Sequence, residues 1–149
     1  MALQQQIDQD IKSAMLAKDD ARLRGLRAIK AALLLARTEK GAAEQISDET
    51  EIRVLQKLVK QRRESADIYK AQNREDLYTI EIEEMNVIEG YLPKQLGRDE
   101  IMAHVQQAIS KVGATGIRDM GKVMGVVNKE LAGKADGKTI SELVKEALQ

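Results

Sequence analysis

Apolar residues recur at steps of three and four along nearly the whole chain, and this spacing constrains the fold more than any other feature. A helix brings residues three and four apart onto one face, whereas a strand would need steps of two. Leu, Ala, Glu, Lys, Gln and Arg dominate, and the 149 residues contain a single proline, Pro93. Since these are good helix formers, the sequence predicts an all-α protein without strands.

Four apolar stripes precede Pro93 and predict a bundle of about four long helices over residues 1–92. Such a bundle runs up and down, or contains one very long bent helix in place of two shorter ones. The stripes are Leu3, Ile7, Ile11 and Ala14 or Met15; Leu23, Leu26, Ile29 and Leu33; Ile52, Leu55, Val59, Ala66 and Tyr69; and Leu77, Ile80, Met85, Ile88 and Tyr91 or Leu92.

Polar segments separate these stripes and supply helix caps. Asp19 or Asp20 can accept from the free N–H groups of the second helix, and Ser47 or Asp48 can do so for the third. Residues 38–48 are expected to form a loop, and residues 71–76 to interrupt the helical pattern, with Asn73 as a cap.

Pro93 marks the predicted domain boundary, because proline cannot continue a helix and biases Leu92 away from helical angles. Residues 93–149 are expected to form a small three-helix subdomain, capped at Asp99 and turning at Gly113 and again between Gly133 and Gly137. Its stripes are Ile101, Val105, Ala108 or Ile109 and Val112; Ile117, Met120, Met124, Val127 and Leu131; and Ile140, Leu143, Val144 and Ala147 or Leu148.

Charge is balanced overall but unevenly distributed. The 24 basic and 24 acidic residues cancel, while residues 1–74 carry +4, residues 75–112 carry −5 and residues 113–149 carry +1. A neutral chain lacks a global attraction to nucleic acid, so any RNA binding must use local patches and be sensitive to salt. With no Trp, no Phe and three Tyr, stacking of single-stranded bases is not expected.

Several functional classes find no support in the residues. The absence of cysteine excludes disulfides, thiolate zinc sites and cysteine catalysis. His104 is the lone histidine and has no ligand cluster around it, so we expect a surface or boundary residue. We predict no catalytic residue, no metal and no cofactor. The N-terminus lacks the pattern of a signal peptide and no apolar run could span a bilayer, so we expect a cytoplasmic protein without membrane contact.

The stretch GIRDMGKVMG, residues 116–125, matches most of a phosphate-binding loop. A working loop of this kind follows a strand and has Ser or Thr after its lysine to bind Mg²⁺. Val123 occupies that position, and the preceding segment has helical period. The sequence therefore favours a helix in which Gly121 and Gly125 form a bare face and Lys122 points outward.

Cations surround these glycines and form the candidate RNA-binding set. Arg118, Lys122 and Lys129 are spaced for one side of the sixth helix, and two further lysines lie in the turn after it. Together with bare backbone, such a surface suits an RNA backbone read by its shape; the alternative is a set of ordinary surface lysines. The candidates are Arg118, Gly121, Lys122, Gly125, Lys129, Lys134 and Lys138.

The charges of the predicted bundle favour a simpler interpretation. Its basic clusters are expected to be solvated helix faces with partners four residues away, such as Arg53 with Glu49 and Arg63 with Asp67. These clusters are Arg22, Arg24, Arg27 and Lys30 on the second helix, and Arg53, Lys57, Lys60, Arg62 and Arg63 on the third. The carboxylates Glu81, Glu83, Glu84 and Glu89 are expected to form a solvated acidic face.

The C-terminal stretch MGKVMGVVNKELAGKADGKTISELVKEAL resembles the tail of GatB, a subunit of the tRNA-dependent amidotransferase. Gly121, Val123 and Met124 match its first helix; Gly133, Lys134 and Ala135 match its turn, and Leu143, Val144 and Leu148 fall in its last helix. The segments DIKSAMLAKDDARLRGLRAIKAAL, KQRRESADIYKAQNREDL and YLPKQL resemble free-standing YqeY proteins, so the resemblance to the GatB/YqeY family covers nearly the whole chain.

This resemblance implies an all-helical protein with two helical subdomains, of which the second is related to a region that recognises tRNA in GatB. The first hypothesis is a tRNA-binding accessory protein that helps an aminoacyl-tRNA synthetase or an amidotransferase and has no catalytic centre of its own. The second is a helical protein–protein adaptor. The third is the carbon–nitrogen ligase activity with glutamine as amido donor that the family resemblance implies, although the catalytic part of GatB has no counterpart here.

Overall fold

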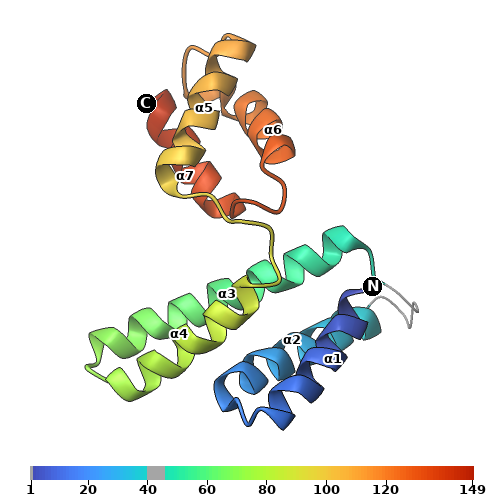
Figure 1. Cartoon of the computed structure of the whole chain (residues 1–149). Coiled ribbons are helices and arrows are strands. Elements are labelled where there is room, and N and C mark those ends of the chain that lie inside the picture. Colours follow the sequence, from blue (N-terminus) through green and yellow to red (C-terminus); the bar gives the residue numbers. More distant parts are fainter. Residues whose placement is uncertain (1, 40–45) are drawn as a thin grey trace. The chain divides into compact units, whose positions relative to one another are not determined.

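The computed structural model describes residues 2–39 and 46–149, and the chain divides into two compact units, Met1–Leu92 and Pro93–Gln149. The first unit holds α1 (Leu3–Leu16), α2 (Asp20–Glu39), α3 (Asp48–Ala71) and α4 (Glu75–Glu89) (Figure 1). The second holds α5 (Arg98–Val112), the 3₁₀ turn η1 (Ile117–Asp119), α6 (Met120–Glu130) and α7 (Gly137–Leu148). The all-helical prediction is confirmed, since the described residues contain no strand.

The first unit consists of two helical hairpins. α1 packs on α2, α3 packs on α4, and α2 joins the hairpins by packing against both α3 and α4. α3 and α4 are separate helices, so the alternative of one very long bent helix is wrong. The core of the unit is built from one apolar face of each helix: Ile7, Ala14, Leu26, Ile29, Leu33, Leu55, Leu58 and Ile88.

The predicted stripes coincide with this core except at particular positions. Ile80 was expected inside and is 39% exposed, whereas Leu58 was not predicted and is buried. Gly25 was also not predicted, yet it lies buried on α2. Leu58 lies three residues after Leu55 and Val59 four residues after it, so the helical period allows either to face the core, and the approach of the neighbouring helices decides which one is buried.

The predicted caps at Asp19 and Ser47 are confirmed. The Asp19 carboxylate accepts from the Arg22 N–H at 3.1 Å, and the Ser47 hydroxyl accepts from the Thr50 N–H at 3.1 Å. The predicted loop over 38–48 begins too early, because α2 continues to Glu39. The part of that prediction over residues 40–45 lies outside the described residues.

Asn73 terminates α3 in a left-handed conformation, with φ 57°. The N–H groups of Asn73 and Arg74 donate back to the carbonyls of Lys70 and Tyr69, at 3.1 and 2.9 Å. This pair of bonds satisfies helix-terminal carbonyls, and asparagine tolerates the required backbone better than most residues. The short turn that follows lets α4 begin at Glu75.

In the second unit α5, α6 and α7 pack on one another around a core of nine residues: Ile101, Val105, Ala108, Val123, Val127, Leu131, Ile140, Leu143 and Val144. Gly97, not Asp99, precedes α5, and the Glu100 carboxylate accepts from the Gly97 N–H at 3.5 Å. The cap prediction at Asp99 is therefore wrong. Gly113 ends α5 with φ 68°, as predicted.

The inward face of α6 differs from the predicted stripe. Ile117 lies in η1 before the helix and is 48% exposed, whereas Val123 is fully buried beside Val127. The predicted apolar stripe of α6 therefore begins one turn too early. The spacing of apolar residues does not reveal where a 3₁₀ turn replaces the α-helix. None of the helices over residues 2–39 and 46–149 combines the length and apolarity needed to cross a bilayer.

Candidate nucleic-acid interface

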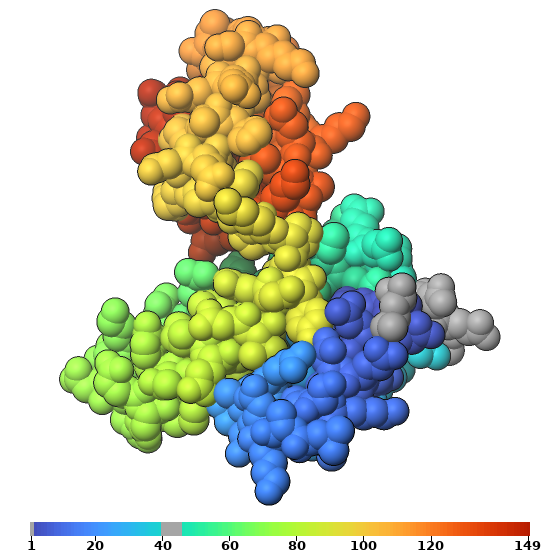
Figure 2. Space-filling view, viewed as in Figure 1, coloured from blue at the N-terminus to red at the C-terminus, as the bar shows by residue number. Residues whose placement is uncertain are grey.

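The solvent side of α6 carries a stripe of cationic side chains and glycine. Lys122, Gly125 and Lys129 follow one another at steps of three and four, which places them on one side of the helix. Arg118 was predicted on the same helix but lies in η1, just before α6 begins. All four residues are exposed, and the buried Val123 and Val127 lie on the other side of the helix. The orange segment of α6 accordingly forms part of the outer surface of its unit (Figure 2). The predicted outward orientation of Lys122 is confirmed.

Gly121 and Gly125 leave open space on this side of α6. A methyl group placed on either glycine would meet no atom within 4 Å among the described residues. No neighbouring helix of the described chain therefore uses the glycine pair for close packing. Such a pair lowers helix stability by about 1 kcal/mol per residue relative to alanine. Packing within its own unit does not account for the pair.

The loop between α6 and α7 presents Lys134, whereas Lys138, which was predicted in the same turn, is the second residue of α7. Gly133 turns the chain with a left-handed φ of 78°, and Asp136 caps α7 by accepting from the Lys138 N–H at 3.4 Å. Lys134 and Lys138 are both exposed. All seven candidates lie within residues 118–138 of the second unit, spread over η1, α6, the loop and the start of α7. Their role in RNA binding stays a prediction.

The five cations of this stretch are not held in close contacts by the side chains that the structure describes. None of the side chains of Arg118, Lys122, Lys129, Lys134 and Lys138 forms an ion pair within 4.0 Å or a hydrogen bond with the described residues. Glu130 and Asp136 are close to these cations in sequence, and Arg118 is followed directly by Asp119. Its carboxylate accepts from the Thr115 N–H at 3.0 Å. That hydrogen bond, followed by the nearby Lys122 and Arg118, lowers the pKa of Asp119.

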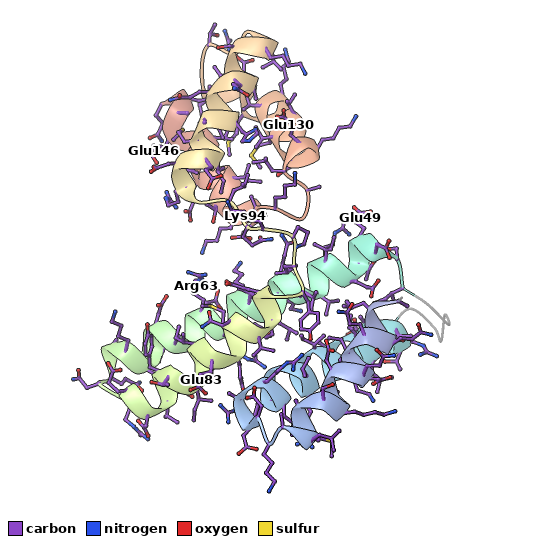
Figure 3. The ribbon with its side chains drawn as sticks, in the orientation of Figure 1. Glu49, Arg63, Glu83, Lys94, Glu130 and Glu146 are labelled. Carbon is purple, nitrogen blue, oxygen red and sulfur yellow. The ribbon has the colours of Figure 1, made fainter. Side chains whose placement is uncertain are left out.

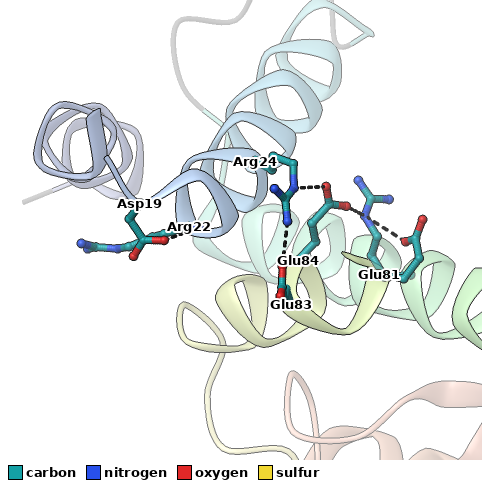
Figure 4. A network of polar contacts seen from close by, with 7 residues as sticks. Asp19, Arg22, Arg24, Glu81, Glu83 and Glu84 are labelled. Carbon is teal, nitrogen blue, oxygen red and sulfur yellow. Dashed lines mark hydrogen bonds and ion pairs between the residues drawn. The ribbon is translucent and has the colours of Figure 1, made fainter. Parts of the chain in front are cut away.

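Arg24 and Arg62 of the first unit are placed differently, because the carboxylates of α4 engage them (Figure 4). Arg24 of α2 contacts Glu83 at 2.8 Å and Glu84 at 3.6 Å. Arg62 of α3 contacts Glu84 at 3.0 Å and Glu81 at 3.8 Å. These contacts join α4 to both neighbouring helices and leave fewer arginines available for a nucleic acid.

The carboxylate side of this network was predicted as a solvated acidic face, which is wrong for Glu81 and Glu84. Their side chains are only 19% and 16% exposed. Removal from water raises the pKa of Glu81, an effect that Arg62 opposes and the neighbouring Glu84 reinforces. The predicted pair of Arg53 with Glu49 is present at 2.9 Å at the start of α3, where Figure 3 labels Glu49. Arg63, however, reaches Glu89 at 3.6 Å instead of Asp67.

His104 lies on α5 with its Nδ1 atom 4.0 Å from Glu130, which Figure 3 labels on α6. Its side chain is about one-third exposed, consistent with the predicted boundary position. Within the described part of the chain, no group of three or more histidine and carboxylate side chains is arranged to hold a metal ion.

Sequence reasoning missed one residue near the candidate loop. The Gln95 side-chain amide donates to the carbonyl of Gly133 at 2.8 Å, and so connects the segment after Pro93 to the loop that carries Lys134. Gln95 lies within the quoted YLPKQL block, but nothing in its local pattern indicates a partner 38 residues away.

The fold and this surface define an all-helical protein of two small units, the second of which exposes a cationic helix. A model of a family described as Yqey-like protein matches residues 4–148, and the chain belongs to this family. The chain is also 30% identical over 142 residues to the altered inheritance of mitochondria protein 41 of Pyrenophora tritici-repentis, a mitochondrial protein. That alignment covers 93% of this chain and 77% of the relative. The predicted cytoplasmic location stays a prediction.

Proposed function

We propose that this chain is an accessory protein that binds structured tRNA through α6 and the α6–α7 loop, and that it makes and breaks no covalent bond itself. One observation carries the proposal: five exposed cations that form no ion pair with the described residues lie in the same stretch of the chain as two helical glycines beside open space. The resemblance of this stretch to the GatB tail directs the proposal to tRNA among nucleic acids.

The chemistry of the surface suits an RNA backbone. Lysine supplies a mobile point charge, and arginine can bind a phosphate through two parallel hydrogen bonds. The glycines allow a sugar–phosphate backbone to approach the helix axis more closely than any side chain would permit. Folded RNA is recognised mainly through its shape and backbone, for which stacking aromatic residues are not required.

Net charge also favours the second unit as the site that binds a polyanion. Residues 93–149 carry nine basic and seven acidic residues, a net charge of +2, whereas residues 1–92 carry 15 and 17, a net charge of −2. The arginines Arg24 and Arg62 of the first unit are in addition held by α4. Attraction of a polyanion is therefore expected to favour the second unit.

Binding of folded tRNA, duplex DNA and unstructured RNA, each at about 50 and 200 mM salt, tests the proposal. We expect preference for tRNA at low salt and a steep loss at the higher salt, since phosphate contacts release counterions. Lys122→Glu and Lys134→Glu should each weaken binding about tenfold or more, because each replaces an attraction by a repulsion.

Lys145→Glu is the matched control. It makes the same change of charge on the exposed side of α7 and should have a small effect. Circular dichroism would establish that all variants keep their helices. Equal binding of the three nucleic acids would contradict the proposal and leave the protein adaptor as the better hypothesis.

A further inference from the structure

The segment that follows Pro93 runs beside the α6–α7 loop and bonds to it at two successive carbonyls. The Gln95 Nε2 atom donates to the carbonyls of Pro93 and Gly133, each at 2.8 Å. The next residue, Leu96, donates its N–H to the carbonyl of Lys134 at 2.9 Å. A side-chain amide nitrogen carries two hydrogens, so Gln95 uses its full donor capacity in this arrangement.

The loop itself offers no alternative partner for these two carbonyls. Its internal bonds run from the N–H groups of Lys134 and Ala135 to the carbonyl of Leu131, at 2.9 and 3.2 Å. Gly133, which lies between Leu131 and Lys134, adopts a left-handed conformation. The outward carbonyls of Gly133 and Lys134 find their only hydrogen-bond partners among the described residues in Gln95 and Leu96. Loss of these donors would leave the loop held at fewer points.

We infer that Gln95 is a positioning residue for the cationic stretch: it holds the α6–α7 loop so that Lys134 is presented beside α6. This inference rests on the proposed function. The backbone of Lys134 is fixed through its carbonyl, while its side chain is exposed and unpaired. An ordered loop loses less conformational freedom when a ligand binds, so fixing its backbone raises affinity without adding a contact.

Gln95→Leu tests the role of the amide, because leucine has a similar size and donates no hydrogen bond. We expect about fivefold weaker binding of tRNA, in line with the loss of one hydrogen bond that orders the site. Gln107→Leu, on the exposed side of α5, makes the same change away from the loop and should leave binding unaltered.

A double variant shows whether Gln95 acts through Lys134. If it does, Gln95→Leu should weaken binding much less in a Lys134→Gln background than in the wild type. A purely structural role would instead give losses that multiply. Multiplying losses, or unaltered binding by Gln95→Leu, would overturn the inference.

Amide hydrogen exchange at Leu96 reports on the contact without any RNA. The Leu96 N–H should exchange slowly in the wild type and faster in Gln95→Leu, while the amides of α7 stay protected. Fast exchange of Leu96 in the folded wild type would overturn the inference even if the variant failed to fold. If the wild type bound no tRNA, the proposed function would be wrong. Slow exchange at Leu96 would then show that the contact between the segment and the loop is nevertheless present.

Discussion

Gly25 of α2 lies so close to Val87 of α4 that no side chain fits between them. A methyl group on Gly25 would come within 2.7 Å of both Cβ and Cγ1 of Val87. Real non-bonded carbon atoms do not approach so closely, so the two helices owe their separation to the missing side chain. This contact positions α4, whose carboxylates reach Arg24 one residue before the glycine.

Gly25→Ala is therefore expected to destabilise the first unit. Alanine gains about 1 kcal/mol in helix propensity, but forcing a methyl group into a packed interface costs about 1–3 kcal/mol. We expect a lower free energy of unfolding in urea for Gly25→Ala. The double variant Gly25→Ala, Val87→Ala should recover part of this stability. A variant as stable as the wild type would show that α4 can shift freely.

Gly121→Ala and Gly125→Ala should have the opposite effect on stability. Both glycines lie in α6 with open space around them, so alanine meets no obstacle and each change should stabilise the second unit by about 0.5–1 kcal/mol. The same changes should weaken tRNA binding if an RNA backbone approaches the glycines. Thermal unfolding and tRNA titration on the same samples would separate the two effects, and unaltered binding would exclude the glycine face as a contact.

Lys18→Gly should stabilise the turn between α1 and α2. Lys18 has a left-handed φ of 54°, and its N–H and that of Asp19 close the end of α1 on the carbonyls of Met15 and Ala14. That conformation costs a non-glycine residue about 1–2 kcal/mol, which glycine would avoid. Glycine also has greater freedom in the unfolded state, which cancels part of this gain, so we expect a net stabilisation of about 0.5–1 kcal/mol.

Lys12→Gly, inside α1, is the matched control for Lys18→Gly and should instead destabilise by about 1 kcal/mol. Urea unfolding compares the two variants directly. If both lost stability equally, the left-handed lysine would carry no strain.

Glu81→Gln tests the effect of pH on the α4 network. Burial raises the pKa of Glu81 above its usual 4.5, so the folded state binds this proton more tightly than the unfolded state does. The carboxylate is therefore disfavoured in the folded protein at neutral pH, and stability from this group rises as the pH falls towards its folded pKa. We expect Glu81→Gln to be at least as stable as the wild type at pH 7. The difference in unfolding free energy between the two should shrink as the pH falls from the raised folded pKa towards 4.5.

The measurement is unfolding free energy against pH, with Glu49→Gln as a control that removes an exposed carboxylate from α3. A difference between Glu81→Gln and the wild type that grew towards acid would contradict the predicted direction.

The sequence by itself determined the features that depend on residues within a turn or two of one another. The period of apolar residues specified an all-helical chain and most of its core. Ser47 and Gly113 specified helix ends, and the spacing of Lys122 and Lys129 placed two cations on the solvent side of α6. These features follow from helix geometry and local hydrogen bonding, which operate over three or four residues.

Only the tertiary structure decided which distant residues meet. The contact of Arg24 with Glu83 spans 59 residues, that of Gln95 with Gly133 spans 38, and Gly25 is buried because α4 passes over it. Such contacts depend on the distance and angle at which helices pack, and many packings satisfy the same apolar stripes. For the same reason the sequence showed cations on both units, and packing alone decided that α4 engages Arg24 and Arg62, whereas Lys122 and Lys129 of α6 form no ion pair with the residues that the structure describes.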